Sequence, residues 1–221
     1  NLDYRLYEII VVDDGSKDNT SKLLIEEFKM TKVRRKIKKS IRCQDEEFIY
    51  ESYAYKVPIV LIRKKNGGKA DALNMGINAS RYPYFVCMDA DSMLQSDALE
   101  RIVRPVLTDE NLIACGGVIR IANGVVLENG KVKKYEMPDN MVAAMQVLEY
   151  ERSFLASRIL FDMFNGSLII SGAFGLFKKD MVIAVGGYDH TTMGEDMELV
   201  VRLHVFCLKN QIPYTIKYAT D

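Results

Sequence analysis

Residues 8–16, Glu-Ile-Ile-Val-Val-Asp-Asp-Gly-Ser, form a short β-branched run closed by two aspartates and a glycine. This pattern predicts a buried parallel strand that ends in a turn. The same pattern returns at Ile59-Val-Leu-Ile62 and at Tyr84-Phe-Val-Cys-Met88, and helical patterns follow the first two runs, at 16–30 and 70–79. Strand, helix, strand, helix, strand implies right-handed crossovers. We therefore expect an α/β fold with a Rossmann-like, mostly parallel central sheet flanked by helices.

The remaining chain predicts further elements of the same domain. A helix is expected at 97–107, a strand at 114–121, a hairpin within 123–130, an amphipathic helix at 141–164, a broken strand at 167–177 and a last helix from Gly194. The basic and then acidic stretch at 31–57 is interpreted as a surface insertion. We expect one domain over 1–221, shortened at both ends. The 141–164 helix is too charged to span a bilayer, and it could lie on a membrane or pack partly in the core.

Composition narrows the function classes. The 221 residues are 48% hydrophobic, enough for a sizeable core, and 30 basic residues balance 30 acidic ones. This balance gives no electrostatic reason to expect a nucleic-acid partner. The four cysteines are widely spaced, which favours free thiols in a reducing compartment. No uncharged apolar run of about 18 residues occurs, so a membrane-spanning segment is not predicted within these residues.

Two pairs of aspartates follow predicted strands. Asp13 and Asp14 follow the first, and Asp89 and Asp91 follow the third, so both pairs are expected at the carboxyl edge of the sheet, where ligands of such folds bind. Carboxylates gathered there would repel one another without a cation. Oxygen ligands suit Mg²⁺ or Mn²⁺, which complete their coordination with phosphate and water. The pattern thus favours a diphosphate ligand, although either pair alone could simply end a strand or cap a helix.

Two motif interpretations fail. A calcium loop starting at Asp89 would have Met93 at a ligand position and Leu94 in place of the required glycine. A phosphate loop ending at Lys69 would have Ala70 where Ser or Thr is needed. The Gly67-Gly68-Lys69 loop can still offer backbone N–H groups and one cation to a phosphate, or be a plain turn.

Gly194-Glu195-Asp196 adds a third acidic group where a helix is predicted to begin. The helix dipole favours an ionised carboxylate there, which is what a general base requires. N-capping is the structural alternative. His190 and His204 lack nearby cysteine pairs, so a zinc site is not expected.

Taken together, these motifs resemble the inverting family 2 glycosyltransferases, which have the glycosyltransferase A-type fold. The resemblance covers nearly the whole chain. It rests on Ile9-Ile-Val-Val-Asp-Asp-Gly-Ser16 with Asp18-Asn-Thr20, Asn66-Gly-Gly-Lys-Ala-Asp-Ala-Leu-Asn74, Met88-Asp-Ala-Asp91, Ser171-Gly-Ala-Phe174 and Gly194-Glu-Asp196.

The resemblance implies a role for each matching residue. Either Asp13 or Asp14 would contact the base and ribose, with Lys69 and Asp71 along the nucleotide. Asp89, Ala90 and Asp91 would form the metal-diphosphate site, with Asp91 the more direct ligand of Mg²⁺ or Mn²⁺. Asp196, beside Glu195, would deprotonate the acceptor hydroxyl, and Ser171 and Gly172 would line the acceptor side.

Within the family, the chain looks most like the membrane-bound polysaccharide synthases, a branch that includes the synthases of poly-N-acetylglucosamine, chitin, hyaluronan and cellulose, and a bacterial source is expected. This implies a UDP-sugar donor, with N-acetylglucosamine as the sugar, a glycan or lipid-linked acceptor, and a catalytic domain at the cytoplasmic face of the membrane, attached through segments outside these residues. The Gln-x-x-Arg-Trp motif of that branch is expected after Asp221, so processivity is only inferred from the resemblance. The alternatives are a single-sugar transferase acting on a lipid phosphate and a catalytically silent nucleotide-sugar-binding module.

Overall fold

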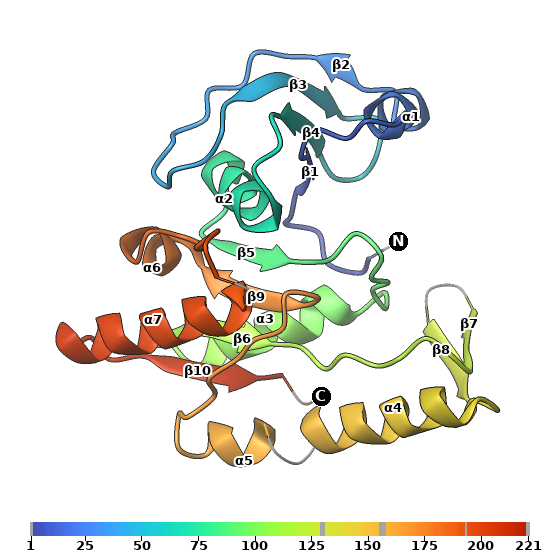
Figure 1. Ribbon diagram of the computed structural model, residues 1–221, viewed down its shortest axis with the longest axis vertical. Coiled ribbons are helices and arrows are strands. Elements are labelled where there is room, and N and C mark those ends of the chain that lie inside the picture. The colour runs from blue at the N-terminus through green and yellow to red at the C-terminus, as the bar shows by residue number, and fades with distance from the viewer. Residues whose placement is uncertain (1, 129–130, 155–157, 193, 220–221) are drawn as a thin grey trace. The chain divides into compact units, whose positions relative to one another are not determined.

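The computed structural model describes residues 2–128, 131–154, 158–192 and 194–219 (Figure 1). The chain forms two compact units, each built from separate stretches of sequence. The first unit consists of Arg5–Phe85 and Lys178–Phe206, and the second unit consists of Asn1–Tyr4, Val86–Phe177 and Cys207–Asp221. None of the described helices has both the length and the apolar character needed to cross a bilayer.

The first unit contains a four-stranded sheet. Its strands, in spatial order, are β1 (Ile9–Asp13), β4 (Ile59–Lys64), β3 (Glu46–Ser52) and β2 (Thr31–Lys32). β1 runs parallel to β4, whereas β3 is antiparallel to both of its neighbours. The helices that lie in this unit, wholly or for most of their length, are α1 (Thr20–Glu27), α2 (Lys69–Ala79), α6 (Lys179–Ala184) and α7 (Glu195–Lys209).

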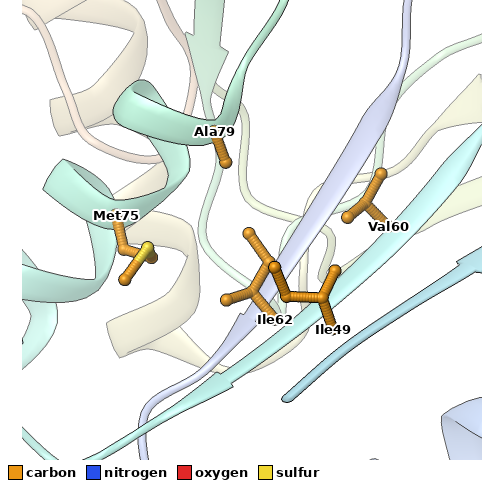
Figure 2. Packing of buried hydrophobic residues seen from close by; sticks show 5 residues of the cluster. All are labelled: Ile49, Val60, Ile62, Met75 and Ala79. Carbon is orange, nitrogen blue, oxygen red and sulfur yellow. The ribbon is translucent and has the colours of Figure 1, made fainter. Parts of the chain in front are cut away.

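β4 shows why this sheet is covered on both faces. Val60 and Ile62 point to one side and pack with Ile49 and with Met75 and Ala79 of α2 (Figure 2). The alternate residues Ile59 and Leu61 pack on the other side with Met30 and with partly buried residues of α1. Because successive side chains of a strand point to opposite faces, a continuous apolar strand needs a cover on each side.

A second four-stranded sheet, of mixed direction, belongs mainly to the second unit, while Tyr84, Phe85 and Lys178 of its strands are assigned to the first unit. Its strands, in spatial order, are β10 (Thr215–Tyr218), β6 (Leu112–Gly116), β9 (Gly175–Lys178) and β5 (Tyr84–Cys87). β6 is parallel to β10 and antiparallel to β9. The unit also holds α3 (Ala98–Thr108), the hairpin of β7 (Val125–Glu128) and β8 (Lys131–Tyr135), α4 (Met141–Arg152) and α5 (Arg158–Asp162).

The predicted α/β class is confirmed, but the three predicted parallel strands do not share one sheet. β1 and β4 pair with each other, whereas β5 belongs to the sheet of β9. Asp13 and Asp89 therefore follow strands of different sheets, whereas the sequence pattern predicts a single shared sheet. Local apolar runs identify strands, but strand pairing depends on contacts between distant segments.

The segment 31–57 is more structured than its charge suggests. It supplies β2 and β3, and it buries the Arg35 side chain to 4% exposure. The Arg35 guanidinium donates hydrogen bonds of 2.9 Å to Glu8 and to Glu51, whose side chains are also buried. A cation neutralised in this way can be buried, and composition alone does not reveal such pairing.

Several predicted elements are shorter than expected. The strand at 114–121 ends at Gly116, and the one at 167–177 is reduced to β9, because Phe174 N donates to Ser171 O in a turn that precedes β9. The tip of the predicted hairpin, residues 129–130, and residues 155–157 of the predicted long helix lie outside the described residues.

The amphipathic helix predicted at 141–164 does not pack in the core over its first part. None of the α4 residues, all of which the structure describes, is buried. Phe154, just beyond α4, is buried and meets the Tyr218 ring at a centroid distance of 6.1 Å. All four cysteines, each within the described residues, carry free thiols.

Candidate functional site

The end of β1 brings two aspartates beside two cations of β4. The parallel register pairs Asp13 with Arg63, so Asp14 follows at the level of Lys64. Asp13 is buried, and its Oδ1 accepts from Ser16 N at 2.7 Å, while its Oδ2 accepts from the Ser21 hydroxyl and from Arg63 Nη1. Burial raises the pKa of the Asp13 carboxyl, but these hydrogen bonds and the Arg63 charge outweigh it and hold the pKa below its usual value.

Asp14 holds the glycine loop that follows β4. Its carboxylate accepts from Gly67 N at 3.0 Å and from Gly68 N at 2.7 Å, and it is ion-paired with Lys64. Asn66 Nδ2 donates in turn to Asp14 O at 2.8 Å. The two loops after β1 and β4 are thus tied together by polar contacts, which gives the glycine loop a fixed shape.

Lys64 is the buried cation of this network. Its side chain has 0% exposure, and its Nζ contacts Asp14 and also lies 2.7 Å from Oδ1 of Asp71. Burial lowers the pKa of Lys64, but hydrogen bonds and charges from the two carboxylates outweigh burial and raise the pKa above its ordinary value. The two carboxylates therefore favour the charged form of Lys64.

The Gly67-Gly68-Lys69 loop leads into α2, and its two glycines fit their positions for different reasons. A Cβ on Gly67 would lie 2.7 Å from Cγ of Asp71, and Gly68 has a φ of 88°, in the left-handed region. Asp71 lies in the first turn of α2, where the helix dipole favours a carboxylate, and Gln44 N donates to it at 3.1 Å. Lys69 is the first residue of α2 and its side chain is 49% exposed.

A pocket of about 130 Å³ lies at the start of α2, within the first unit. Lys69 Nζ is 3.2 Å from Oε1 of Glu195, the first residue of α7. Asp196, the next residue, is half-buried in the first turn of α7. The pocket is lined by Gly67, Gly68, Lys69, Ala70, His190, Thr192 and Glu195. It therefore combines the glycine loop, whose Gly67 and Gly68 N–H groups donate to Asp14, with one cation and one carboxylate.

Asp89, Ala90 and Asp91 lie in the second unit, in a turn closed by a 3.0 Å hydrogen bond from Ser92 N to Asp89 O. Asp89 is half-buried, and Ala90 and Asp91 are exposed. Two carboxylates on one open turn fit a Mg²⁺ or Mn²⁺ ion that takes its other ligands from phosphate and water. Across the described ranges, no three His, Cys, Asp or Glu side chains form a complete protein cage for a metal.

Ser171 and Gly172 also lie in the second unit, just before β9. Gly172 is buried, and Ser171 is half-buried with its hydroxyl accepting from Ala173 N at 3.4 Å. Their predicted acceptor-side role stays a prediction. The structure thus brings Asp14, Lys69, Asp71 and Glu195 into linked contacts within the first unit, with Asp13 beside Asp14, while the metal and acceptor-side candidates belong to the second unit.

Three polar residues of the first unit are not singled out by the sequence patterns. Lys64 falls in a strand-to-loop connection, Asn66 and Asn74 appear only as motif letters, and each makes tertiary hydrogen bonds. Lys64 could have been found from its place in the sequence, because it ends an apolar strand whose expected parallel neighbour ends in two aspartates. Asn74 gives no local signal, because its partner is Tyr188, 114 residues away.

Two curated proteins of similar sequence are synthases of one glycan. The chain is 29% identical over 204 residues to the poly-β-1,6-N-acetyl-D-glucosamine synthase of Staphylococcus aureus, covering 92% of this chain and 40% of that protein. It is 28% identical to the synthase of the same name from Staphylococcus epidermidis, covering 99% of this chain and 42% of that protein. The chain thus spans about two-fifths of the length of these curated relatives.

The fold also has a counterpart among solved structures. A mannosyltransferase from Pyrobaculum calidifontis, in complex with GDP-Man and Mn²⁺, matches with a TM-score of 0.60 and 16% identity, covering 97% of this chain and 46% of that one. At this identity the match shows the fold alone, and it confirms the predicted glycosyltransferase A-type architecture. The family model described as "Glycosyl transferase family 2" matches residues 45–186, more than half of the chain. This chain therefore belongs to glycosyl transferase family 2.

Proposed function

We propose that this chain is the catalytic domain of an inverting transferase that moves N-acetylglucosamine from its UDP conjugate to a growing glycan. The observation that carries the proposal is the pocket where Lys69 at the start of α2 meets Glu195 at the start of α7, in a chain of family 2. The similarity to poly-β-1,6-N-acetyl-D-glucosamine synthases supports the choice of sugar and of acceptor.

In this proposal the nucleotide lies along the loops after β1 and β4. Asp13 and Asp14 are almost fully engaged in protein hydrogen bonds, so their part is to shape the loops and to accept from the base or ribose with remaining lone pairs. Lys69 offers its ammonium to the diphosphate, and Asp71, paired with Lys64, lies with Lys69 along the nucleotide. The pocket lies at the start of α2, where the helix dipole favours anionic oxygens.

Asp89 and Asp91 would hold Mg²⁺ or Mn²⁺, with Asp91 the more direct ligand. The cation would supply charge neutralisation for the departing nucleoside diphosphate. Asp196 is the proposed general base. It takes the proton of the acceptor hydroxyl while the acceptor oxygen bonds to the anomeric carbon, and the bond from that carbon to the diphosphate breaks with its electron pair leaving on UDP. Attack opposite the leaving group inverts the anomeric centre.

Glu195, Ser171 and Gly172 have supporting roles in this proposal. Glu195 balances the charge of Lys69, and the other two residues line the acceptor side. The enzyme would act at the cytoplasmic face of the cell membrane, with its membrane attachment supplied by segments outside these residues. The resemblance of its motifs to those of membrane-bound polysaccharide synthases supports this placement.

The test uses the full-length enzyme in its membrane and measures UDP released from UDP-N-acetylglucosamine. We expect release that stops on chelation and returns with Mg²⁺ or Mn²⁺. Asp196→Asn should abolish release while UDP still binds. Asp189→Asn is the matched control, because the Asp189 carboxylate belongs to the loop before α7 and accepts from Thr191 N at 2.8 Å. We expect this control to retain release.

Three outcomes would count against parts of the proposal. Turnover retained in Asp196→Asn would remove the assigned base. Products carrying one added sugar would indicate a single-sugar transferase. Normal UDP binding with no release from any UDP-sugar would indicate a silent binding module.

A further inference from the structure

Asn74 links two distant segments of the first unit through a complementary pair of hydrogen bonds. Its Nδ2 donates to Tyr188 O at 2.8 Å, and its Oδ1 accepts from Tyr188 N at 2.8 Å. The Asn74 side chain is buried at 4% exposure and Tyr188 at 3%. A carboxamide is the side-chain group that can both donate to and accept from one residue's backbone in this way.

The backbone before Tyr188 is shaped around this contact. Gly186 and Gly187 both have left-handed φ angles, 91° and 78°, which glycine adopts without strain. A Cβ on Gly187 would lie 2.5 Å from Oδ1 of Asn74 and 2.4 Å from Cγ2 of Ile41. The glycine pair therefore lets the chain pass close enough to α2 for Tyr188 to reach Asn74.

The two segments joined by this contact each lead to one wall of the pocket. Asn74 lies in α2, whose first residue is Lys69. The segment that follows Tyr188 contributes His190 and Thr192 to the pocket, and then Glu195, which pairs with Lys69 at 3.2 Å. Asp196 follows directly, in the first turn of α7. The contact thus joins the two segments that carry the pocket-lining residues.

We propose that Asn74 is a positioning residue that sets the place of the Glu195-Asp196 segment relative to the Gly67-Gly68-Lys69 loop. This inference rests on the proposed function, because that function assigns the base to Asp196 and the diphosphate contact to Lys69. A misplacement of a reacting group by about 1 Å can cost about a hundredfold in rate. Loss of the contact should therefore lower kcat more than it changes nucleotide affinity.

The same helix offers a matched control. Asn78, one turn further along α2, makes an equivalent pair of hydrogen bonds with Ile41, accepting from Ile41 N at 3.0 Å and donating to Ile41 O at 2.7 Å. Asn78 is also buried, at 6% exposure. Its bonds hold the segment before β3, not the segment that leads to Asp196. The Ile41 side chain lies close to Gly187, so a change at Asn78 could reach Tyr188 through packing. The control therefore shows how much kcat changes through packing alone.

The experiment compares Asn74→Leu with Asn78→Leu in the full-length enzyme. We expect similar losses of Tm, UDP dissociation constants within about threefold of wild type, and a kcat that falls about tenfold or more in Asn74→Leu only. Asn74→Ala removes the same two hydrogen bonds without adding side-chain volume, so it provides a second variant, with the same expected loss of kcat, should Asn74→Leu fail to fold. Equal losses of kcat in the Asn74 and Asn78 variants, or an unchanged kcat in Asn74→Leu, would overturn the inference.

A second readout does not depend on turnover. Amide hydrogen exchange should rise in peptides covering 188–192 for the Asn74 variants, and in peptides covering 33–45 for Asn78→Leu. If the wild-type enzyme transfers no sugar, the proposed function fails, yet the exchange pattern still decides whether Asn74 holds this segment. Unchanged exchange at 188–192 in Asn74→Leu would refute the positioning role by itself.

Discussion

The Nζ atom of Lys64 lies 2.7 Å from Oδ1 of Asp71 while its side chain is completely buried, and the same ammonium group is ion-paired with Asp14. One buried cation therefore joins three parts of the candidate nucleotide site: the loop after β1, the end of β4 and the first turn of α2. Two carboxylates held against one ammonium depend on it for charge compensation, because removal of one member of a buried ion pair leaves uncompensated charge.

Lys64→Met should destabilise the fold by about 3 to 5 kcal/mol, the range for breaking a buried ion pair from one side. Urea denaturation measures the change, and UDP titration should show weaker binding because the glycine loop loses its anchor. Lys65→Met, at the exposed neighbouring position, is the control and should behave like wild type. Adding Asp71→Asn to Lys64→Met should recover part of the lost stability. A Lys64→Met protein as stable as wild type would contradict this prediction.

Asp13 should make stability depend on pH in the acidic range. Its folded-state pKa is lowered, so its contribution is fully present above the unfolded pKa of about 3.9 and is lost as pH falls through the folded value. Asp13→Asn should therefore reduce the free energy of unfolding by about 1 to 3 kcal/mol above about pH 5, and the two proteins should converge once the pH falls below the folded-state pKa of Asp13. Urea denaturation of both proteins across this pH range tests the prediction. A difference in the free energy of unfolding that grows toward low pH would contradict it.

Lys69 should matter for binding and little for stability. Its ion pair with Glu195 is half exposed on the lysine side, and such pairs contribute about 0 to 1 kcal/mol. We expect Lys69→Gln to leave the urea midpoint nearly unchanged but to weaken UDP binding about tenfold, equivalent to about 1.4 kcal/mol. Calorimetric titration at two salt concentrations gives the affinity, with a smaller salt dependence expected in the variant. Unaltered affinity would mean that Lys69 does not contact the diphosphate.

Gly67 and Gly68 should respond differently to alanine. A Cβ on Gly67 would lie 2.7 Å from Asp71 Cγ, so Gly67→Ala must displace the carboxylate that Lys64 holds, at a cost of about 1 to 3 kcal/mol. A Cβ on Gly68 meets no described atom within 4 Å, but its φ of 88° makes Gly68→Ala strained by about 1 to 2 kcal/mol. UDP titration should show weaker binding in Gly67→Ala than in Gly68→Ala. The reverse order would argue against a coupling between Asp71 and the nucleotide site.

Much of the local structure follows from short stretches of sequence. The end of β1 at Asp13 and the start of α7 at Glu195 are predicted within one or two residues, because β-branched runs and acidic helix starts act over a few neighbouring residues. The motif around Asn66 to Asn74 likewise points to family 2, which the family match confirms. Which strands pair is not predictable in this way, since β5 has the same apolar pattern as β1 but joins the sheet of β9.

The sequence by itself determined the α/β class, the family and the residue types available for chemistry, because these depend on local patterns and on ordered motifs. Tertiary structure alone decided that Lys64 is a buried cation between Asp14 and Asp71, and that Asn74 meets Tyr188 across 114 residues. The physical reason is the same in both cases. A buried charge or amide is tolerable only when a partner satisfies it, and that partner comes from a segment whose position is set by the packing of the whole unit.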